Sequence, residues 1–393
     1  MTNLPQGWEV KKLGEIFNIE RGGSPRPIKE FLTDKEDGIN WIKIGDIKNQ
    51  KYLYATEEKI IQEGLKKSKL VIEGDLLVSN SMSFGKPVIV KLQKGAIHDG
   101  WLLLKEKINL NKEYFYYLFS SNFMYDFLSY QASGSTVKNL NIDKLKQIEI
   151  PLPPLQEQER IVEILDESFA KIDESIKILE QDLLNLDELM QSALQKAFNP
   201  LKDNTKENYK LSQGWEKFNF DNIFYSPSSK NYQLNTKDYL EKGCIPIIDQ
   251  SKKFIIGYSN NYEKVFKINN CNNSCIIFGD HTRVLKFIDF DFIVGADGVK
   301  ILLNKDIERF NTKFLFFQLL YKDIPLLGYR RHFSVLKQNT FSIPPLKEQE
   351  QIASHLDELS SHVKNLKQNY QMQIKNLQEL KKSLLDKAFQ GRL

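Results

Sequence analysis

Two long stretches of the chain carry apolar residues at alternating spacings of three and four, which is the pattern of a helix with one buried stripe. The first stretch begins near Ile161 and the second near Ile352. A helix of about 45 residues is roughly 65 Å long and cannot bury such a stripe alone. We therefore predict that the two helices form a coiled coil. The predicted seam consists of Ile161, Leu165, Ile172, Ile176, Leu179, Leu183, Leu186, Ile352, Leu356, Val363, Leu366, Leu377, Leu380 and Leu384.

Several short phrases occur twice in the chain. "PPLQEQERI" begins at Pro153, and "PPLKEQEQI" begins 191 residues later at Pro344. Leu-Asp-Glu and Lys-Ala-Phe follow both phrases at the same offset, whereas the two "QGWE" phrases, at Gln6 and Gln213, are 207 residues apart. The chain is therefore a duplication whose helical segments keep equal lengths. Proline suits a first helical turn and glutamate suits its positive end, so the repeated phrase predicts a helix start.

The stretches between these phrases predict mixed, strand-rich domains. Apolar runs such as 75–80 and 274–279 are broken by Gly, Asn and Asp, as in strands joined by turns. The aromatic runs 112–119 and 312–320 indicate helices with core-facing rings rather than base-stacking platforms. We predict an α+β fold with an internal pseudo-two-fold duplication. Two mixed α/β globular domains, 1–152 and 200–343, each precede a long helix, 153–199 and 344–393, and this order favours antiparallel packing of the helices.

The basic residues are concentrated in the globular domains. The chain has 55 Lys+Arg and 51 Asp+Glu, a net charge of +4. Residues 1–150 hold 22 basic against 19 acidic side chains, and residues 201–343 hold 21 against 15. This asymmetry favours an acidic partner such as nucleic acid. Three cysteines, no long apolar run and no apolar leader predict a cytoplasmic protein without a membrane partner.

Motifs of catalysis are missing from the sequence. It contains no Gly-rich phosphate loop ending in Lys-Ser or Lys-Thr, and no Asn-Pro-Pro-aromatic tetrapeptide of amino-methyltransferases. Cys271, Cys275 and His281 resemble part of a zinc site, but no fourth ligand is evident and Cys275 lies in an apolar run. We predict no catalytic residues, no metal site and no cofactor in this chain.

Polar and basic loops recur at matched positions in the two domains. Asn, Ser, Thr and Arg side chains read base edges, while Lys and main-chain amides hold phosphates. These loops are therefore the candidate DNA-binding segments. The candidate residues are Arg21, Ser24, Arg26, Ser79, Asn80, Ser81, Lys86, Ser135, Thr136, Lys138, Asp280, His281, Thr282, Arg283, Arg330, Arg331 and His332.

These motifs, in this order and in two copies, resemble the specificity subunits of type I restriction-modification systems. The resemblance rests on the "GW…LG" opening, "GSTVKNLN", "GDHTR…DFIVGADGVKIL" and "P-PL-EQ…I…LDE" before a coiled coil, and it covers essentially the whole chain. The second domain departs from it by opening "GWEKFNFDNIF", without Leu-Gly. This departure leaves the form of its first turn open.

The resemblance implies a non-catalytic DNA-recognition subunit. Its two target recognition domains would each read one half of an asymmetric, bipartite double-stranded DNA target. The two conserved helices would fix the spacer between the halves and dock two methyltransferase (modification) subunits. Those subunits and the restriction (helicase-nuclease) subunits would supply the chemistry, using S-adenosylmethionine, ATP and Mg.

Two other functions remain open from the residues alone. A coiled-coil scaffold with peptide-binding end domains would show no DNA affinity. An enzyme with an unrecognised site would turn over a substrate without partners.

Overall fold

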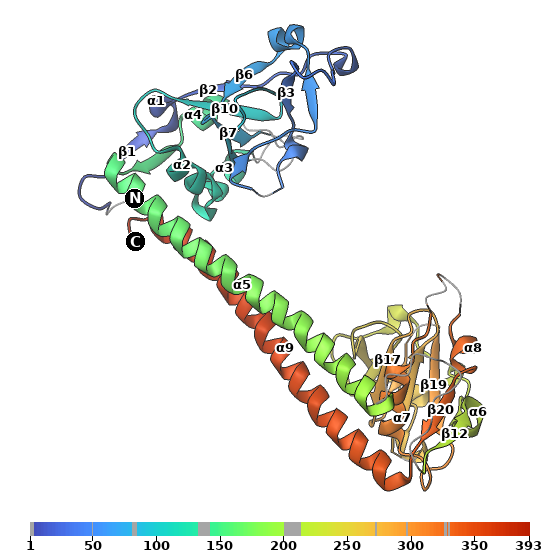
Figure 1. Cartoon of the computed structure of the whole chain (residues 1–393). Helices are drawn as coiled ribbons and strands as arrows, with labels where there is room; N and C mark the ends of the chain where they lie inside the picture. The colour runs from blue at the N-terminus through green and yellow to red at the C-terminus, as the bar shows by residue number, and fades with distance from the viewer. Residues whose placement is uncertain are drawn as a thin grey trace. The chain divides into compact units, whose positions relative to one another are not determined.

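The computed structural model describes residues 4–48, 50–80, 85–132, 142–199, 214–271, 273–295, 298–325, 328 and 331–393, with only the backbone for 129–132, 270 and 271. The chain forms two compact units (Figure 1). Unit 1 contains residues 1–179 and 371–393, and unit 2 contains residues 180–370. Each unit thus combines one globular domain with parts of both long helices.

Unit 1 contains three sheets. The largest has the order β2 (Phe17–Arg21), β10 (Trp101–Glu106), β7 (Leu76–Ser79), β8 (Pro87–Val90) and β4 (Tyr52–Leu53). The second has the order β5 (Glu58–Ile60), β3 (Ile39–Ile42), β9 (Lys94–Ile97) and β6 (Lys69–Ile72), and β1 (Glu9–Lys12) pairs with β11 (Glu149–Leu152). Neighbouring strands are antiparallel except for the parallel pairs β3–β9 and β4–β8.

The aromatic run of unit 1 forms a helix with a buried face, as predicted. It is α2 (Lys112–Ser120), whose Tyr114, Phe115 and Leu118 lie in the main hydrophobic core. The side chain of Asn111 accepts hydrogen bonds from the main-chain N–H groups of residues 113 and 114, and thereby caps the helix. The other helices of the unit are α1 (Leu13–Ile16), α3 (Asn122–Ala132), α4 (Ile142–Lys146) and the 3-10 turns η1 (Ile28–Glu30), η2 (Ile44–Asp46) and η3 (Gln62–Lys67).

The described sheets of unit 2 repeat the strand order of unit 1 without counterparts of the edge strands β4 and β6. One sheet has the order β13 (Phe224–Tyr225), β19 (Val299–Asn304), β16 (Cys275–Gly279) and β17 (Leu285–Ile288). Another has the order β15 (Gly257–Ser259), β14 (Ile245–Ile248) and β18 (Ile293–Val294), and β12 (Glu216–Asn219) pairs with β20 (Thr340–Ile343). The parallel pair β14–β18 corresponds to β3–β9. The predicted duplication is therefore confirmed at the level of the fold.

The helices of unit 2 follow the same scheme. The second aromatic run is α7 (Thr312–Tyr321), capped by the side chain of Asn311. The segment without Leu-Gly still forms a short helix, α6 (Phe220–Ile223), in the place of α1. The remaining elements are α8 (Phe333–Leu336) and the 3-10 turns η4 (Lys230–Tyr232), η5 (Thr236–Asp238), η6 (Tyr262–Lys264) and η7 (Ile268–Cys271).

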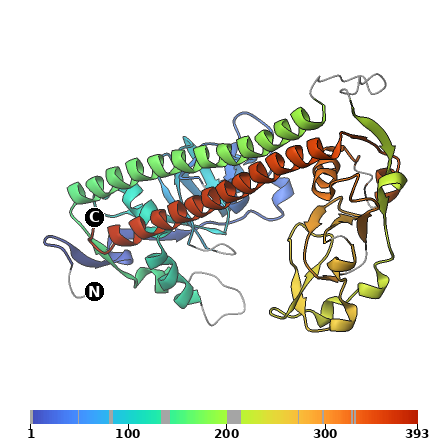
Figure 2. The ribbon, with the colours of Figure 1, turned by 90° about the horizontal axis from the view of Figure 1, so that it is seen from below.

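The two long helices are α5 (Leu155–Phe198) and α9 (Leu346–Ala388), and they run side by side in opposite directions (Figures 1 and 2). In unit 1, Lys381 of α9 pairs with Asp173 of α5 at 2.7 Å. In unit 2, Lys367 pairs with Asp187. Asp187 comes 14 residues after Asp173 in α5, and Lys367 comes 14 residues before Lys381 in α9. Residue numbers that rise on one helix and fall on the other are those of antiparallel helices. The predicted antiparallel packing is confirmed.

The predicted seam is wrong at two positions. Leu366 and Leu380 are 40% and 45% exposed. Beyond Val363, Lys367 and Lys381 face α5 in place of the leucines that precede them, whereas Leu377 and Leu384 are half-buried as the pattern predicts. Each lysine lays its stem along the helix pair and extends its ammonium group to an aspartate of α5. The apolar spacing did not reveal this, because a lysine stem can occupy a position that the pattern assigns to leucine.

The repeated Leu-Asp-Glu and Lys-Ala-Phe phrases hold the helices to the globular domains. Asp166 of α5 accepts hydrogen bonds from Lys51, at 2.9 Å, and from the hydroxyl of Tyr117 in unit 1. At the equivalent position in unit 2, Asp357 of α9 pairs with Lys313 at 2.8 Å. The end of α9 returns to unit 1, where the ring of Phe389 packs edge-on to Tyr114 at 5.3 Å. The end of α5 does the same in unit 2, where Phe198 packs against Phe314 at 5.4 Å.

Candidate nucleic-acid interface

In unit 1 the candidate loops emerge at one edge of the sheets. The end of β2 lies beside the start of β10, which lies beside the end of β7, and the parallel strands β3 and β9 end together. The main-chain N–H groups of Gly22 and Gly23 join the two sheets at this edge, by donating to the carbonyl oxygens of Trp101 and Ile97 at 2.9 and 3.1 Å. We call residues 21–27, 43–48, 79–80, 85–86 and 98–100 the loop edge of unit 1.

Asp99 organises the arginine-bearing loop of this edge. Its carboxylate accepts a hydrogen bond from Ser24 Oγ at 2.8 Å and lies 3.9 Å from the guanidinium of Arg26. Its carbonyl oxygen accepts from Arg21 Nε at 3.0 Å. Burial alone would raise the pKa of Asp99, but the hydrogen bond from Ser24 and the charges of the two arginines lower the pKa overall. The predicted residues Arg21, Ser24 and Arg26 are therefore brought together around one carboxylate that the sequence analysis had not selected.

The tautomer of His98 follows from its partners. The main-chain N–H of Gly100 donates to His98 Nδ1 at 2.9 Å, so in the neutral ring the proton lies on Nε2. Nε2 is 2.9 Å from Asp99 Oδ1 and donates to it. His98 thus orients Asp99 without having to be charged.

A cavity of about 570 Å³ opens beside these residues. Its walls include Arg26, Trp41, Lys43, Glu58 and His98. Lys43 Nζ lies 2.9 Å from Glu58 Oε1, and the hydrogen bond to Glu58 raises the pKa of Lys43. Lysine and arginine donate to guanine, and glutamate accepts from the amino group of cytosine, so this cluster has the chemistry to read base edges. The side chain of Arg26 is 82% exposed and can therefore contact a ligand.

The hairpin after β7 combines structural and exposed residues. Ser79 is buried, and its hydroxyl accepts a hydrogen bond from the main-chain N–H of Lys86 at 2.9 Å, which helps to close the hairpin. Asn80 is fully buried, and within the described structure its side-chain amide has no hydrogen-bond partner. Lys86 is exposed. Ser81, Ser135, Thr136 and Lys138 lie outside the described residues.

In unit 2 the corresponding loops also meet at one edge. Asp280 follows β16, and its buried carboxylate accepts a hydrogen bond from the main-chain N–H of Phe333 at 2.8 Å. Its carbonyl oxygen accepts from the main-chain N–H of the fully buried His332, also at 2.8 Å. Asp280 and His332 thus tie two candidate loops together, whereas the neighbouring Arg331 is exposed. Arg330 lies outside the described residues.

A third loop, after β14, joins this edge through Gln250. Its side-chain oxygen accepts from the main-chain N–H of His281 at 3.1 Å, and its carbonyl oxygen accepts from Thr282 Oγ1 at 2.6 Å. His281 and Thr282 are both exposed, as a contact with DNA requires. We call residues 249–254, 280–284 and 331–332 the loop edge of unit 2.

A buried lysine supports the loop after β14. Lys286 of β17 is nearly inaccessible, and its ammonium group donates to the carbonyl oxygens of Asp249 and Lys253 at 2.8 and 2.6 Å. Burial lowers the pKa of Lys286, although the nearby Asp249 carboxylate opposes the shift. The exposed Lys252 and Lys253 are thereby presented on a fixed backbone. The sequence marks Lys286 only as an inward position in an alternating strand, without indicating its partners.

Arg283 already makes a hydrogen bond within the protein through its guanidinium group. Its backbone has a φ of 62°, and one of its guanidinium nitrogens donates to the carbonyl oxygen of Ile324. The residue therefore helps to join the 280–284 loop to the segment after α7. Its predicted contact with DNA stays a prediction.

No metal centre or membrane span is found in the described part of the chain. Among the described side chains, no group of three or more His, Cys, Asp or Glu residues is arranged to hold a metal ion. Cys275 is buried in β16, His281 is exposed, and the side chain of Cys271 lies outside the described ones. None of the described helices is long and apolar enough to cross a membrane.

Two similar domains of mixed sheets, each with a polar loop edge and joined by antiparallel helices, define a class of two-domain recognition proteins. The model of the type I restriction modification DNA specificity domain matches residues 5–183 and 212–376. This chain belongs to that family.

Individual relatives agree with this assignment. The chain is 25% identical to the putative type I restriction enzyme MjaX specificity subunit of Methanocaldococcus jannaschii over 99% of this chain and 94% of that protein. It is 28% identical to the MjaIX specificity subunit of the same organism, over 62% of this chain and only 58% of that protein's length. A solved chain from work on the complex assembly and conformational transition of the type I R-M system has the same fold, with a TM-score of 0.75, 20% identity and full coverage of both chains.

Proposed function

We propose that this chain is the DNA-recognition subunit of a type I restriction-modification complex, in which each globular domain reads one half of an asymmetric, bipartite target. The observation that carries the proposal is the loop edge that recurs in both units. In unit 1 it offers Arg26 and Lys43, the latter beside Glu58 of β5, and in unit 2 it offers Lys252 and Thr282. Because one fold presents different side chains in its two copies, the two half-sites differ in sequence.

We propose that the helix pair docks two methyltransferase subunits. Apolar side chains outside the seam support this role, because contiguous exposed apolar surface marks interaction sites. They comprise Ile178, Met372 and Leu380 in unit 1, and Leu184, Leu189 and Leu366 in unit 2. A relative's structure described as a complex of the type I R-M system supports partners of this kind.

The chemistry belongs, in this proposal, to the partner subunits. They supply S-adenosylmethionine-dependent methylation and, with restriction subunits present, ATP- and Mg-dependent cleavage in the cytoplasm. This chain contributes sequence recognition and no catalytic group.

Binding and turnover assays test the proposal together. The purified chain is mixed with duplex DNA at increasing salt, and cells that contain it with modification subunits are mapped for methylated sites. We expect salt-dependent DNA binding, methylation at one bipartite sequence, and no methylation by the chain alone. DNA affinity that is absent at low salt, or turnover by the chain without its partners, would refute the proposal. The first result would favour the scaffold with peptide-binding ends.

A further inference from the structure

A buried glutamine joins the start of α5 to the globular part of unit 1. Gln158, the last glutamine of the repeated phrase, is 2% exposed. Its side-chain oxygen accepts a hydrogen bond from the main-chain N–H of Asn111 at 2.9 Å, at the start of α2. Its side-chain nitrogen donates to the carbonyl oxygen of Pro153 at 2.9 Å, just before α5 begins. One amide therefore links the starts of two helices, through residues that are 47 positions apart in the sequence.

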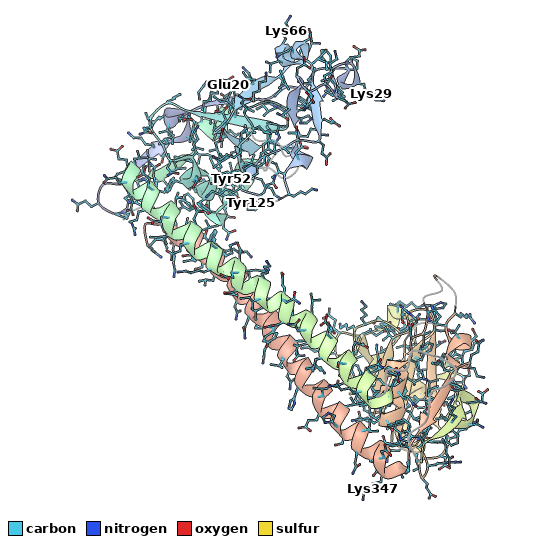
Figure 3. The ribbon with its side chains drawn as sticks, viewed as in Figure 1. Glu20, Lys29, Tyr52, Lys66, Tyr125 and Lys347 are labelled. Atoms are coloured by element: carbon cyan, nitrogen blue, oxygen red, sulfur yellow. The ribbon has the colours of Figure 1, made fainter. Side chains whose placement is uncertain are left out.

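The same link is present in unit 2. Gln349 is fully buried, accepts from the main-chain N–H of Asn311 at 2.8 Å and donates to the carbonyl oxygen of Pro344 at 2.8 Å. It also donates to the carbonyl oxygen of Arg309 at 2.9 Å. Lys347, two residues earlier in the phrase, is exposed at the start of α9 (Figure 3). Among the polar residues of the phrase, Gln158 and Gln349 are the buried ones in their units.

The two repeated phrases of the chain meet at this link. In unit 1 the glycine of "QGWE", Gly7, has a positive φ, and a Cβ there would lie 3.5 Å from the ring of Pro154. In unit 2 a Cβ on Gly214 would lie 3.7 Å from Pro345, and the indole of Trp215 donates to Glu348 at 3.1 Å. The opening of each domain is therefore packed onto the first turn of its own long helix.

The arrangement does more than start a helix. A proline pair and a glutamate are sufficient to begin a helix on the surface, and they need no buried amide. A buried amide that bridges two main-chain groups fixes both the distance and the direction between them, because either group would be left unpaired if the helix turned away. On the domain side each glutamine binds the start of α2 or α7, and these helices supply buried aromatic side chains to the cores of their domains.

We propose that Gln158 and Gln349 are positioning residues that hold each DNA-reading domain at a fixed angle to its spacer helix. The inference rests on the proposed function, because a fixed angle matters only if two half-sites must be met at one separation. A domain that swings on its helix lowers the effective concentration of the second half-site once the first is bound. It also meets half-sites at more than one separation. The glutamines thus act on the tolerance for spacer length and not on the bases that are read.

The test uses the full chain with its modification subunits. Gln158→Met removes both side-chain hydrogen bonds at nearly constant length, and Gln349→Met removes the three of Gln349 in unit 2. The matched control is Gln156→Met, because Gln156 is exposed two residues earlier on the same helix. Methylation mapping defines the target of the unaltered protein, and DNA affinity is then measured on that target, on duplexes with spacers one pair longer or shorter, and on a duplex with one half-site.

We expect Gln158→Met and Gln349→Met to bind the full target about tenfold more weakly and to discriminate less between spacer lengths, with unchanged affinity for a single half-site. Gln156→Met should behave as the unaltered protein does. A merely structural role would instead lower the affinity for every duplex by the same factor, and that result overturns the proposal. Discrimination equal to that of the control overturns it as well.

Two further outcomes are distinguishable. If the Met variants do not fold, Gln158→Asn decides, because it keeps the amide but is one methylene too short to reach both partners, and it must show the same loss of spacer discrimination. If the unaltered protein methylates no bipartite sequence, the proposed function fails, and the positioning role fails with it. A bipartite target with variants that match the control refutes the positioning role alone.

Discussion

Phe389, which directly follows α9, should stabilise unit 1, whose globular domain is N-terminal in the sequence. Phe389 is 2% exposed in the core of unit 1, where its ring packs edge-on to Tyr114 of α2 at 5.3 Å. Replacing a buried phenylalanine by alanine costs about 3 to 5 kcal/mol, which includes the cavity that remains. We therefore expect Phe389→Ala to lower the free energy of unfolding of unit 1 by about that amount, although residue 389 directly follows the C-terminal helix.

Hydrogen exchange followed by mass spectrometry locates the effect. A loss of about 3 to 5 kcal/mol raises the exchange rate of amides that exchange through unfolding of the unit by roughly 100-fold to 4,000-fold. The increase should appear in peptides from α2 of unit 1 and not in peptides from α7 of unit 2. The mirror variant Phe198→Ala should do the reverse, because Phe198 packs against Phe314 of α7 at 5.4 Å.

The control for this experiment is Phe127→Ala in α3, because Phe127 is 39% exposed and lies outside the main hydrophobic core, so its loss should change the free energy of unfolding by less than about 1 kcal/mol. If Phe389→Ala accelerates exchange in α7 and leaves α2 protected, the helix ends do not belong to the domains to which the packing assigns them. Equal acceleration in both helices would also contradict the argument, because it would mean that the two units unfold together.

Three other changes test the proposed interface and helix pair. Arg26→Ala should weaken binding of the target by about 1 to 3 kcal/mol and relax the sequence preference in one half-site only, whereas Lys105→Ala, at the far end of β10, should change neither in the same binding assay. Leu380→Glu should abolish co-purification with modification subunits while DNA affinity and the thermal unfolding midpoint stay unchanged, and retained co-purification would exclude this surface. Leu179 and Leu377 line the same groove between α5 and α9, so one heptad inserted after Leu179 and one before Leu377 should lengthen each helix by roughly 10 Å. The spacer between the methylated half-sites should then grow by about one to three base pairs. An unchanged spacer in methylation maps would show that the helices do not set its length.

The duplication and the helix pair could be predicted from the sequence because their signals are local. Proline, glutamate and apolar spacing mark where α5 and α9 begin, and the aromatic runs of α2 and α7 are apolar enough to indicate core helices. The exact seam required the tertiary structure. The pattern assigned Leu366 and Leu380 to the seam, but Lys367 and Lys381 face α5 instead, because their partners, Asp187 and Asp173, are on that helix.

The candidate interface was predicted in part. Residue types and matched positions selected the arginine-bearing loop around Arg26 and the loop after β16, and the structure places each of them at a loop edge. The pairing of Lys43 with Glu58, and of Gln250 with the loop after β16, was not predicted, because each depends on strand register between distant segments.

In the repeated phrase, some residues act through local sequence and others only through contacts made in the folded chain. Its prolines and glutamates act through the backbone of their own helix, so the sequence alone determined that a helix starts there. The role of Gln158 depends on the main-chain N–H of Asn111, which is 47 residues away. Only the folded chain brings the two groups to 2.9 Å in a buried site, where an unpaired amide would be costly, and so only the tertiary structure distinguishes this glutamine from its exposed neighbour Gln156.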